Sequence, residues 1–381
     1  MKKKILLIID SLKLGGAQTY LSELSKYFLC RNYKVYICGK KDVMINRFPN
    51  GITFMDIDFE GRNIVKLFYN SLYLFWQIKK KNITLLHFNV IFPLPFIYLF
   101  SKIFCRQIPI VVTIHKIWET ETRWFKNLFL NIIYLTLNYV PWAIIVLNSE
   151  SLALIKKNLI CSQNLFLIPN GIEINSNEKE SDSLYLKQNI FTFVNDPIIF
   201  GYIGRLEYIK RCDLLIKIFY RISLSFPNVR LVIIGTGKEE KKLKKIVENL
   251  SLTNLVHFTG FQEKVDGYLN LIDILLITSV SEGISYSMLE ALKFGLPIIA
   301  YNAPGINVLV KNDYNGFLIQ QTNEKLFVEK AIELAKNRNL RKKFSENSKL
   351  MVKENFSLNQ MGISTEKVYS FVFNLNKQES I

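Results

Sequence analysis

The sequence predicts an α/β protein made of two doubly wound, Rossmann-like domains, and three observations support this prediction. Short apolar runs alternate with longer amphipathic segments along the whole chain. The runs are apolar at nearly every position, which is typical of strands in a parallel sheet covered by helices on both faces. The chain of 381 residues, 49% of them hydrophobic, is also longer than a single core usually supports.

Two series of strands follow from these runs. The first series is Lys4–Ile9, Lys34–Cys38, Thr53–Ile57, Leu85–Phe88, Ile110–Ile114 and Ala143–Leu147. The second series is Ile198–Ile203, Arg230–Ile234, Val256–Thr259, Ile274–Ile277, Ile298–Ala300 and Phe317–Ile319. A polar stretch separates them, and we place an interdomain linker near Ile172–Glu180. The tail Asn355–Ile381 is polar at its end and is expected to fray.

Two segments imitate membrane-targeting signals. The start, MKKKILLIIDSLKLGG, has an apolar core of only Ile5–Ile9 before Asp10, so we interpret it as a buried strand and not a signal peptide. The stretch Leu85–Ser101 carries no formal charge and approaches the length of a membrane span. Because His87, Asn89 and two prolines interrupt it, we favour a strand, a loop and a short helix.

The chain is basic, and its excess of positive charge is unevenly distributed along the sequence. Lys and Arg outnumber Asp and Glu by 49 to 32, which gives a net charge of +17. Residues 1–177 hold 22 basic and 10 acidic residues (+12), and the remainder holds 27 and 22 (+5). Such an excess suits an anionic membrane surface, a phosphorylated substrate or nucleic acid. No zinc-finger, RRM or KH pattern supports nucleic acid. The remaining alternative is that the lysines bind no partner and only keep the protein soluble.

The cysteines and histidines argue against a disulfide framework and a metal centre. The five cysteines form no CxxC pair, which is typical of buried thiols in a reducing compartment. Only three histidines are present, His87, His115 and His257, which is too few for a multi-histidine metal site. We therefore expect neither a zinc site nor a multi-histidine metal site.

The segment Ser279–Pro297, SVSEGISYSMLEALKFGLP, is the most informative in the chain. A buried strand precedes it, so the pattern predicts a strand, a turn at Gly283–Ser285 and a helix. Unpaired N–H groups at a helix start suit a phosphate, and Ser285 is a candidate N-cap. Glu282 precedes the turn, and Glu290 lies where its carboxylate could accept two hydroxyl hydrogen bonds. These features predict a nucleotide-sugar site; the alternative is an ordinary βα unit with exposed acids.

This segment resembles the signature of two glutamates seven residues apart in the retaining glycosyltransferases of family 4, also called group 1. Further segments extend the resemblance over nearly the whole chain: Gly15-Gly16-Ala17, His115, Pro169-Asn170-Gly171, Gly204-Arg205-Leu206 with Lys210, and His257–Phe261. The resemblance implies the glycosyltransferase B-type fold, in which two Rossmann-like domains enclose the active site in an interdomain cleft. It also implies that a last helix, about residues 360–381, packs back onto the N-terminal domain. The resemblance further implies that no metal and no other cofactor is needed.

The resemblance implies a role for each motif. Arg205 and Lys210 would line an open cleft and neutralise the diphosphate of the donor. Glu290 would hold the ribose, and Glu282 would contact the transferred sugar. His115 would hydrogen-bond a hydroxyl of that sugar and support charge at its anomeric carbon. Further donor contacts would come from Gly15, Gly16, Gly204, Phe258, Gly283, Ile284 and Ser285.

The chain departs from the family pattern at four places. Lys116 stands where the family usually has Asp, and Glu173 replaces the Asp that usually follows the Asn-Gly turn. Arg211 occupies a position that is often glycine. Near Asn307 the chain lacks a glutamate that many relatives have. Each departure puts one detail of the implied chemistry in question.

These features together predict an enzyme that moves a sugar, with retention, from a nucleotide-diphosphate sugar to a saccharide or lipid-linked saccharide. The pathway would be the synthesis of capsule, lipopolysaccharide or another cell-surface polysaccharide. The domain of residues 1–174 would bind the acceptor, and the domain of residues 175–359 the donor. Two alternatives remain: a sugar-nucleotide epimerase of the same fold, and a non-catalytic carbohydrate-binding protein.

The N-terminal half also predicts contact with a membrane. Apolar, aromatic segments with basic neighbours occur at Leu67–Trp76, before Lys79–Lys81, and at Trp124–Tyr139. Lysines beside aromatic rings suit an anionic leaflet. We therefore expect a cytoplasmic protein that can associate with the inner face of the membrane. The alternative is that these aromatic side chains pack on the sheet.

Overall fold

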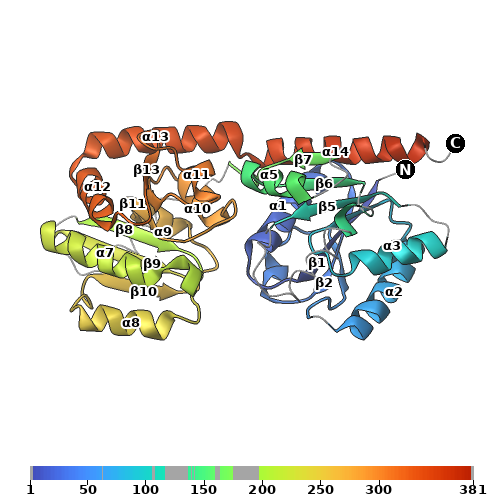
Figure 1. Ribbon diagram of the computed structural model, residues 1–381, viewed down its shortest axis with the longest axis horizontal. Coiled ribbons are helices and arrows are strands. Elements are labelled where there is room, and N and C mark those ends of the chain that lie inside the picture. The colour runs from blue at the N-terminus through green and yellow to red at the C-terminus, as the bar shows by residue number, and fades with distance from the viewer. Residues whose placement is uncertain are drawn as a thin grey trace. The chain divides into compact units, whose positions relative to one another are not determined.

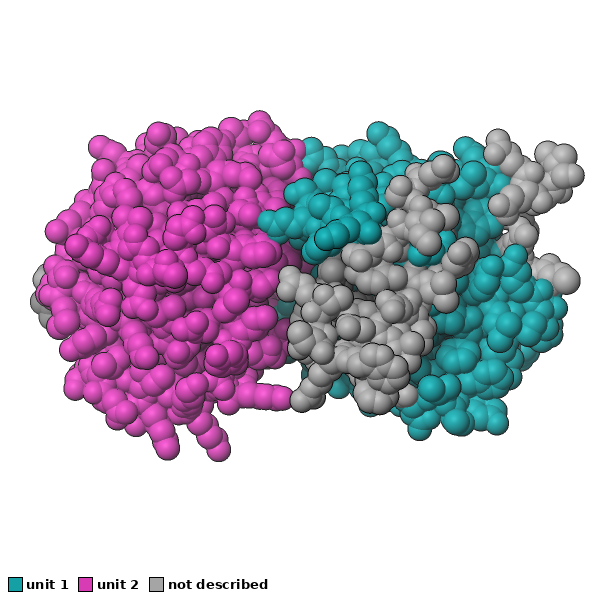
Figure 2. Space-filling view, in the orientation of Figure 1, with its two compact units in different colours: residues 1–173, 358–381 teal, residues 174–357 magenta. Residues whose placement is uncertain are grey.

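The computed structural model describes residues 3–61, 63–104, 108–115, 136–138, 140, 142–158, 164–174 and 197–378. The chain forms two compact units, which Figure 2 colours separately. Unit 1 comprises residues 1–173 and 358–381, and unit 2 comprises residues 174–357. Each unit contains one parallel sheet with helices packed against it (Figure 1), so the predicted fold class is confirmed.

Unit 1 is built on a seven-stranded sheet of order β3-β2-β1-β4-β5-β6-β7, in which every neighbouring pair is parallel. Its strands are β1 (Lys4–Ser11), β2 (Lys34–Lys40), β3 (Thr53–Asp56), β4 (Leu85–Phe88), β5 (Ile110–Ile114), β6 (Ala143–Val146) and β7 (Leu165–Leu167). Its described helices are α1 (Gly16–Cys30), α2 (Ile64–Lys81), α3 (Leu94–Ile103), α5 (Ser149–Asn158) and α14 (Leu358–Gln378), with a 3₁₀ turn η1 (Val43–Arg47).

Unit 2 is built on a six-stranded parallel sheet of order β10-β9-β8-β11-β12-β13. Its strands are β8 (Ile198–Ile203), β9 (Val229–Ile234), β10 (Val256–Gly260), β11 (Ile274–Ile277), β12 (Ile298–Tyr301) and β13 (Gly316–Ile319). Its described helices are α7 (Cys212–Ser225), α8 (Glu240–Asn249), α9 (Asp266–Leu271), α10 (Tyr286–Lys293), α11 (Ile306–Leu309), α12 (Glu324–Lys336) and α13 (Arg338–Asn355), with a 3₁₀ turn η2 (Tyr208–Lys210).

The two sheets share one topology. In each, the first three strands extend the sheet in one direction and the fourth strand is added on the other side of the first. The strand order therefore reverses between β1 and β4 in unit 1 and between β8 and β11 in unit 2. Ligands of open α/β sheets bind at the carboxyl ends of the strands at such a reversal. The fold thus directs attention to the loops after these four strands.

The predicted strands are confirmed, with ends that differ by at most two residues. The sequence interpretation missed β7, whose three residues are only partly covered and so lack a continuous buried pattern. The start of the chain forms β1, and the uncharged stretch Leu85–Ser101 forms β4, a loop and most of α3, as predicted. In the described part of the chain, no helix combines the length and apolar character that crossing a membrane requires.

The expectation that the tail frays is wrong as far as residue 378. Leu358–Gln378 forms α14, which belongs to unit 1. Tyr27 and Tyr33 each donate a hydrogen bond to the carboxylate of Glu366, at 3.1 and 2.9 Å, and Phe28 stacks on Tyr369 at 4.9 Å. These contacts fix the helix against α1, which explains why it stays ordered despite its polar composition.

Several predictions concern residues outside the described ranges. Lys116, the linker beyond residue 174 and most of Trp124–Tyr139 lie there, as do Cys105 and Cys161. Among the described cysteines, Cys38 and Cys212 are buried free thiols as expected, whereas Cys30 is exposed. Burial raises the pKa of the Cys212 thiol to about 12, so this side chain stays a neutral thiol.

Candidate active site

The strongest feature of unit 2 is an ion pair between two predicted site residues. The ammonium group of Lys210 donates a hydrogen bond to Oε1 of Glu282, and the Ser279 hydroxyl donates to the same oxygen at 2.7 Å. Only 15% of the Lys210 side chain and 12% of the Glu282 side chain are exposed. The fold therefore unites the motif after β8 with the motif after β11, at the reversal of strand order.

The backbone around this pair is fastened by further hydrogen bonds. The Thr278 hydroxyl donates to the carbonyl oxygens of Lys210 and Arg211, both at 3.0 Å, and the Val280 N–H donates to the carbonyl oxygen of Ile209 at 3.0 Å. These bonds tie the turn η2 to the loop after β11. The Lys210 side chain is consequently held in place by its own backbone as well as by its carboxylate partner.

Gly305 allows a third loop to approach Glu282. Its φ of +79° is in the left-handed region that favours glycine, and a Cβ there would lie 2.1 Å from the Glu282 carbonyl oxygen. The Glu282 N–H donates to the Pro304 carbonyl oxygen at 3.1 Å. The Ala303-Pro304-Gly305 turn therefore supports the Glu282 loop directly.

Arg205 is placed differently from Lys210. Its guanidinium donates to Glu207 at 2.9 Å, and 62% of its side chain is exposed. The Tyr202 hydroxyl donates to the Arg205 carbonyl oxygen at 3.1 Å, which fixes the backbone after β8. The two cations were expected to line an open cleft alike. The Arg205 side chain is exposed, whereas the Lys210 side chain is largely covered because it pairs with Glu282.

Arg211 adopts a backbone conformation that accounts for the glycine often found there in the resembling family. Its φ of +52° and ψ of +40° are left-handed, and it is the residue before α7 begins. Glycine reaches this conformation without steric cost, whereas other residues do so less readily. The Arg211 Nε lies 3.5 Å from the Asp213 Oδ1, so the Asp213 carboxylate compensates the positive charge that Arg211 adds.

The start of α10 is formed as predicted, but without a side-chain cap. Ser285 is the N-cap residue, with extended backbone, yet its hydroxyl is hydrogen-bonded to the Ser287 hydroxyl at 2.9 Å and not to the backbone of the first turn. Gly283 is exposed, while the Ile284 side chain is buried. Ile284 can therefore contribute only its backbone to a ligand.

Glu290 and Phe258 complete the predicted donor residues of unit 2. Glu290 is half-buried in the second turn of α10. Phe258 packs against the hydrophobic core of unit 2, with the Lys244 ammonium 5.7 Å from its ring centre. The contact of Phe258 with a base stays a prediction. Gly260 ends the strand β10.

In unit 1, His115 is paired with Asn89. His115 follows β5 and Asn89 follows β4, and the His115 Nε2 lies 2.7 Å from the Asn89 Oδ1. The Asn89 N–H donates to the Ile8 carbonyl oxygen at 2.8 Å, and the edge of the Tyr20 ring packs on His115 at 4.9 Å. These contacts hold the imidazole at the carboxyl ends of the central strands.

The partner of His115 determines its chemistry. An amide oxygen only accepts, so Nε2 carries the proton and donates it to Asn89. Burial lowers the pKa of the imidazole to about 4, which keeps the ring neutral near pH 7. His115 therefore presents Nδ1 as a hydrogen-bond acceptor, the property that binding a sugar hydroxyl requires.

Gly15 and Gly16 lie at the start of α1, after β1. The backbone of Gly15 is extended, with φ of 178°, and a Cβ on Gly16 would meet no atom within 4 Å. Packing within the chain therefore does not require glycine at position 16. An uncrowded backbone at a helix start remains available for close approach by a ligand.

Comparison with known proteins agrees with the fold. The family model Glycosyltransferase Family 4 matches residues 14–176, and the model Glycosyl transferases group 1 matches residues 186–351. The chain belongs to the group 1 glycosyltransferases of family 4. The two models together cover every predicted site residue and all described strands except β1.

Three known proteins illustrate the similarity of this chain in sequence or in fold. An uncharacterized glycosyltransferase of Haemophilus influenzae is 34% identical over 150 residues, which is 39% of this chain and 42% of that protein. The chain thus spans less than half of that relative. The O-antigen biosynthesis glycosyltransferase WclY of Escherichia coli is 25% identical over 78% of this chain and 84% of its own length. HepE of Anabaena, solved in complex with UDP and glucose, superposes with a TM-score of 0.81 at 20% identity, over 97% of this chain and 99% of that one.

The sequence did not reveal the roles of two side chains, Asn89 and His87. Asn89 was noted only as an interruption of an apolar run, although a polar residue directly after a buried strand is a usable signal. His87 was also noted only in that way. It is fully buried and hydrogen-bonded to the Tyr369 hydroxyl and the Thr113 hydroxyl, both at 2.6 Å. It links β4, β5 and α14, which is a structural role.

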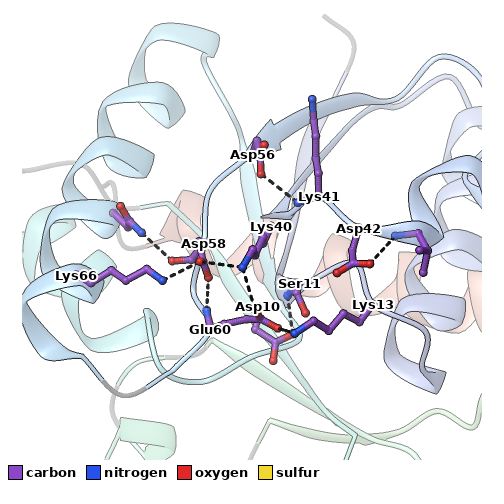
Figure 3. A network of polar contacts seen from close by, with 12 residues as sticks. Asp10, Ser11, Lys13, Lys40, Lys41, Asp42, Asp56, Asp58, Glu60 and Lys66 are labelled. Carbon is purple, nitrogen blue, oxygen red and sulfur yellow. Dashed lines mark hydrogen bonds and ion pairs between the residues drawn. The ribbon is translucent and has the colours of Figure 1, made fainter. Parts of the chain in front are cut away.

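A network of charges at the carboxyl ends of β1–β3 was also missed (Figure 3). Lys13 contacts Glu60 at 2.5 Å, Lys40 lies 3.4 Å from Glu60 and 3.5 Å from Asp58, and Lys66 contacts Asp58 at 2.7 Å. The lysines and carboxylates alternate, so their charges compensate each other. The hydrogen bond from Lys13 lowers the pKa of the Glu60 carboxyl and keeps it ionised.

Proposed function

We propose that this protein is a retaining glycosyltransferase that uses a nucleotide-diphosphate sugar as donor and a saccharide or lipid-linked saccharide as acceptor. The observation that carries the proposal is the Lys210–Glu282 pair at the strand-order reversal of unit 2, directly before the start of α10. A cation, a carboxylate and a helix start in one place supply the groups that a diphosphate and a sugar need.

The roles within unit 2 follow from the chemistry of each group. Arg205, Lys210 and the backbone at Gly283–Ser285 would hold the diphosphate, and Glu290 would bind the ribose hydroxyls. Glu282 would contact the transferred sugar through the carboxylate oxygen that Lys210 does not occupy. When the bond between the anomeric carbon and the diphosphate breaks, its electron pair leaves on the diphosphate. Stabilising that charge is the main catalytic task.

The neutral His115 would act on the sugar side of the reaction. Its Nδ1 can accept a hydrogen bond from a hydroxyl of the transferred sugar, and its uncharged ring tolerates developing positive charge at the anomeric carbon. The acceptor hydroxyl would form the new bond on the face that the diphosphate vacates. Side-chain charges would thus do the work without a metal, and we expect activity to survive treatment with EDTA.

The proposed acceptor class rests on the relatives. WclY takes part in O-antigen biosynthesis, and HepE was solved with UDP and glucose. We propose a role in the synthesis of O-antigen, capsule or a related cell-surface polysaccharide, with UDP as the first nucleotide to test. The enzyme would work in the cytoplasm at the inner face of an anionic membrane.

A donor panel with released nucleotide as the readout tests the proposal. Each nucleotide-diphosphate sugar is incubated with and without saccharide and lipid-linked acceptors. We expect nucleotide release to depend on the acceptor. Release or inversion without any acceptor would favour a sugar-nucleotide epimerase. Donor binding without turnover under every condition would favour a carbohydrate-binding protein.

A further inference from the structure

Helix α2 of unit 1 is apolar on both of its faces. Its inner face packs into the core of the unit through side chains such as Leu74 and Ile78, which are fully buried. Its outer face exposes Ile64 (69%), Tyr69 (64%) and Trp76 (53%). Surface helices normally place polar side chains outward. The outer face of α2 is therefore suited to contact something other than water.

The exposed side chains form continuous rows along the helix. Ile64, Phe68, Leu72 and Trp76 follow one another at intervals of four residues, as do Val65, Tyr69 and Tyr73. Tyr73 stacks on Trp76 at 6.2 Å. The first row continues directly into Lys80, whose ammonium lies 4.9 Å from the Trp76 ring centre. One stripe thus joins apolar, aromatic and basic groups.

Helix α3 extends this surface. The two helices lie side by side (Figure 1), with Phe68 packed against Phe96 at 5.9 Å and Phe100 at 5.4 Å. On α3, Leu99 and Ile103 are exposed by 48% and 60%. We call this surface the α2–α3 face and define it by Ile64, Tyr69, Tyr73, Trp76, Leu99 and Ile103.

The charge on this face has one sign. The sequence contains no Asp or Glu between Glu60 and Glu119. Lys79 lies over the Phe104 ring at 4.5 Å, and Lys102 over the Tyr98 ring at 5.6 Å. Among the residues that the structure describes, no carboxylate forms an ion pair with Lys79, Lys80 or Lys102. Their charge is therefore not compensated locally, unlike that of Lys66, which pairs with Asp58.

We infer that the α2–α3 face docks on an anionic lipid bilayer. Exposed Trp and Tyr beside aliphatic side chains insert at the level of the headgroups, and lysines bind anionic headgroups. A protein partner fits less well, because protein interfaces are depleted of lysine. The sequence left open whether the aromatic side chains of α2 face a membrane or pack on the sheet, and the structure separates the two groups. Leu67, Leu74 and Phe75 pack inward, whereas Tyr69, Tyr73 and Trp76 do not.

The biological purpose of membrane docking rests on the proposed function, because a bound bilayer would present a lipid-linked acceptor. The docking itself does not need the reaction. Vesicle binding can be measured without a donor, so a failure of the docking inference and a failure of the proposed function are distinguishable.

Co-sedimentation of the full-length protein with vesicles tests the inference. One set of vesicles is phosphatidylcholine alone, and the other contains phosphatidylglycerol as well. The variants are Trp76→Ser and the double change Lys79→Gln with Lys80→Gln. The matched control is Lys241→Gln with Lys245→Gln on α8, which removes two exposed lysines from unit 2. Thermal melting confirms that each variant is folded.

We expect binding to the anionic vesicles that high salt reverses. The Lys79 and Lys80 change should weaken it about 25-fold, about fivefold for each lysine, and the α8 control should not change it. Trp76→Ser should weaken binding to the anionic vesicles at low salt, because it removes an aromatic ring that inserts at the level of the headgroups. Absence of binding to anionic vesicles, or equal binding by the wild type and both α2 variants, would overturn the inference. So would a dimer in sedimentation velocity that Trp76→Ser abolishes without any vesicle binding, since the face would then join two copies.

Discussion

Lys210 and Glu282 are separated by 72 residues in the sequence and form a largely covered ion pair in the structure. The pair is the point at which the motif after β8 meets the motif after β11. The Glu282 carboxylate neutralises the cation that we assign to the diphosphate. Binding of donor would therefore bring a second anion to a lysine that is already oriented.

Lys210→Ala should lower both activity and stability. The change leaves the Glu282 carboxylate covered and without its ammonium partner, which we expect to cost about 1–3 kcal/mol in the free energy of unfolding. It should also remove about 2–4 kcal/mol of transition-state stabilisation. Urea unfolding and kcat/KM measure the two effects.

Arg205→Ala is the matched comparison, because its side chain is exposed and paired only at the surface. A comparable loss of kcat/KM is expected, with a change in the free energy of unfolding within about 0.5 kcal/mol. If both variants keep turnover within a few-fold of the wild type, the phosphate assignment is wrong.

Glu290→Gln and Glu282→Gln should have different effects. Glu290→Gln should mainly weaken binding of free nucleotide, since the ribose is common to all donors of one type. Glu282→Gln should lower turnover more than nucleotide affinity, since its partner is the sugar. Calorimetry with free nucleotide and steady-state kinetics separate the two, and equal losses of affinity would remove the basis for assigning separate roles.

Asn89→Asp should change the pH dependence of the reaction. A carboxylate beside Nε2 favours the charged imidazole and raises the pKa of His115 from about 4. Protonation removes the acceptor lone pair of Nδ1, so kcat/KM should fall with decreasing pH at a higher pH in the variant than in the wild type. Profiles of kcat/KM against pH check this, with Asn70→Asp on α2 as a control. Superimposable profiles of Asn89→Asp and wild type would show that Nδ1 does not act as proposed.

Mild acid should destabilise unit 1 through the fully buried His87 and the half-buried His115. Burial lowers the pKa of His87 to about 3 and that of His115 to about 4, below the ordinary value of 6.5. The unfolded chain then binds more protons than the folded one as pH falls below 6.5. Each histidine should therefore reduce the free energy of unfolding by about 1.4 kcal/mol per pH unit down to its folded pKa.

Denaturant unfolding at about pH 7, 6 and 5 measures this slope. His257, whose pKa burial also lowers, acts in the same direction in unit 2. Replacing His87 by Asn should remove a large part of the slope. A free energy of unfolding that does not change over this range would contradict the buried, neutral state of these rings.

The strands were predictable from the sequence because their apolar runs are continuous, as in Ile274–Ile277 and Ile198–Ile203. The motif residues were identified by their resemblance to the family pattern, and Gly204 and His115 also follow such a run directly. Position after a buried strand is a local property, and local properties are what a sequence displays.

Pairings between distant residues were not predictable in this way. Nothing local in the sequence indicates that Lys210 meets Glu282, or that Asn89 sets the protonated nitrogen of His115. The family resemblance implied the last helix, but not its contacts, because Glu366 finds its tyrosine partners more than 330 residues away. Composition alone described this segment as a polar tail. The structure supplies the contacts that keep it folded.

Binding of UDP and of uridine to the wild type and to Lys210→Ala, measured by calorimetry, tests the central claim most directly. The two ligands differ in the diphosphate that Lys210 is proposed to hold. The account predicts that Lys210→Ala weakens UDP binding at least about tenfold, as loss of a charge-assisted hydrogen bond should, and leaves uridine binding unchanged. Equal losses for both ligands, or no loss for UDP, would contradict the account.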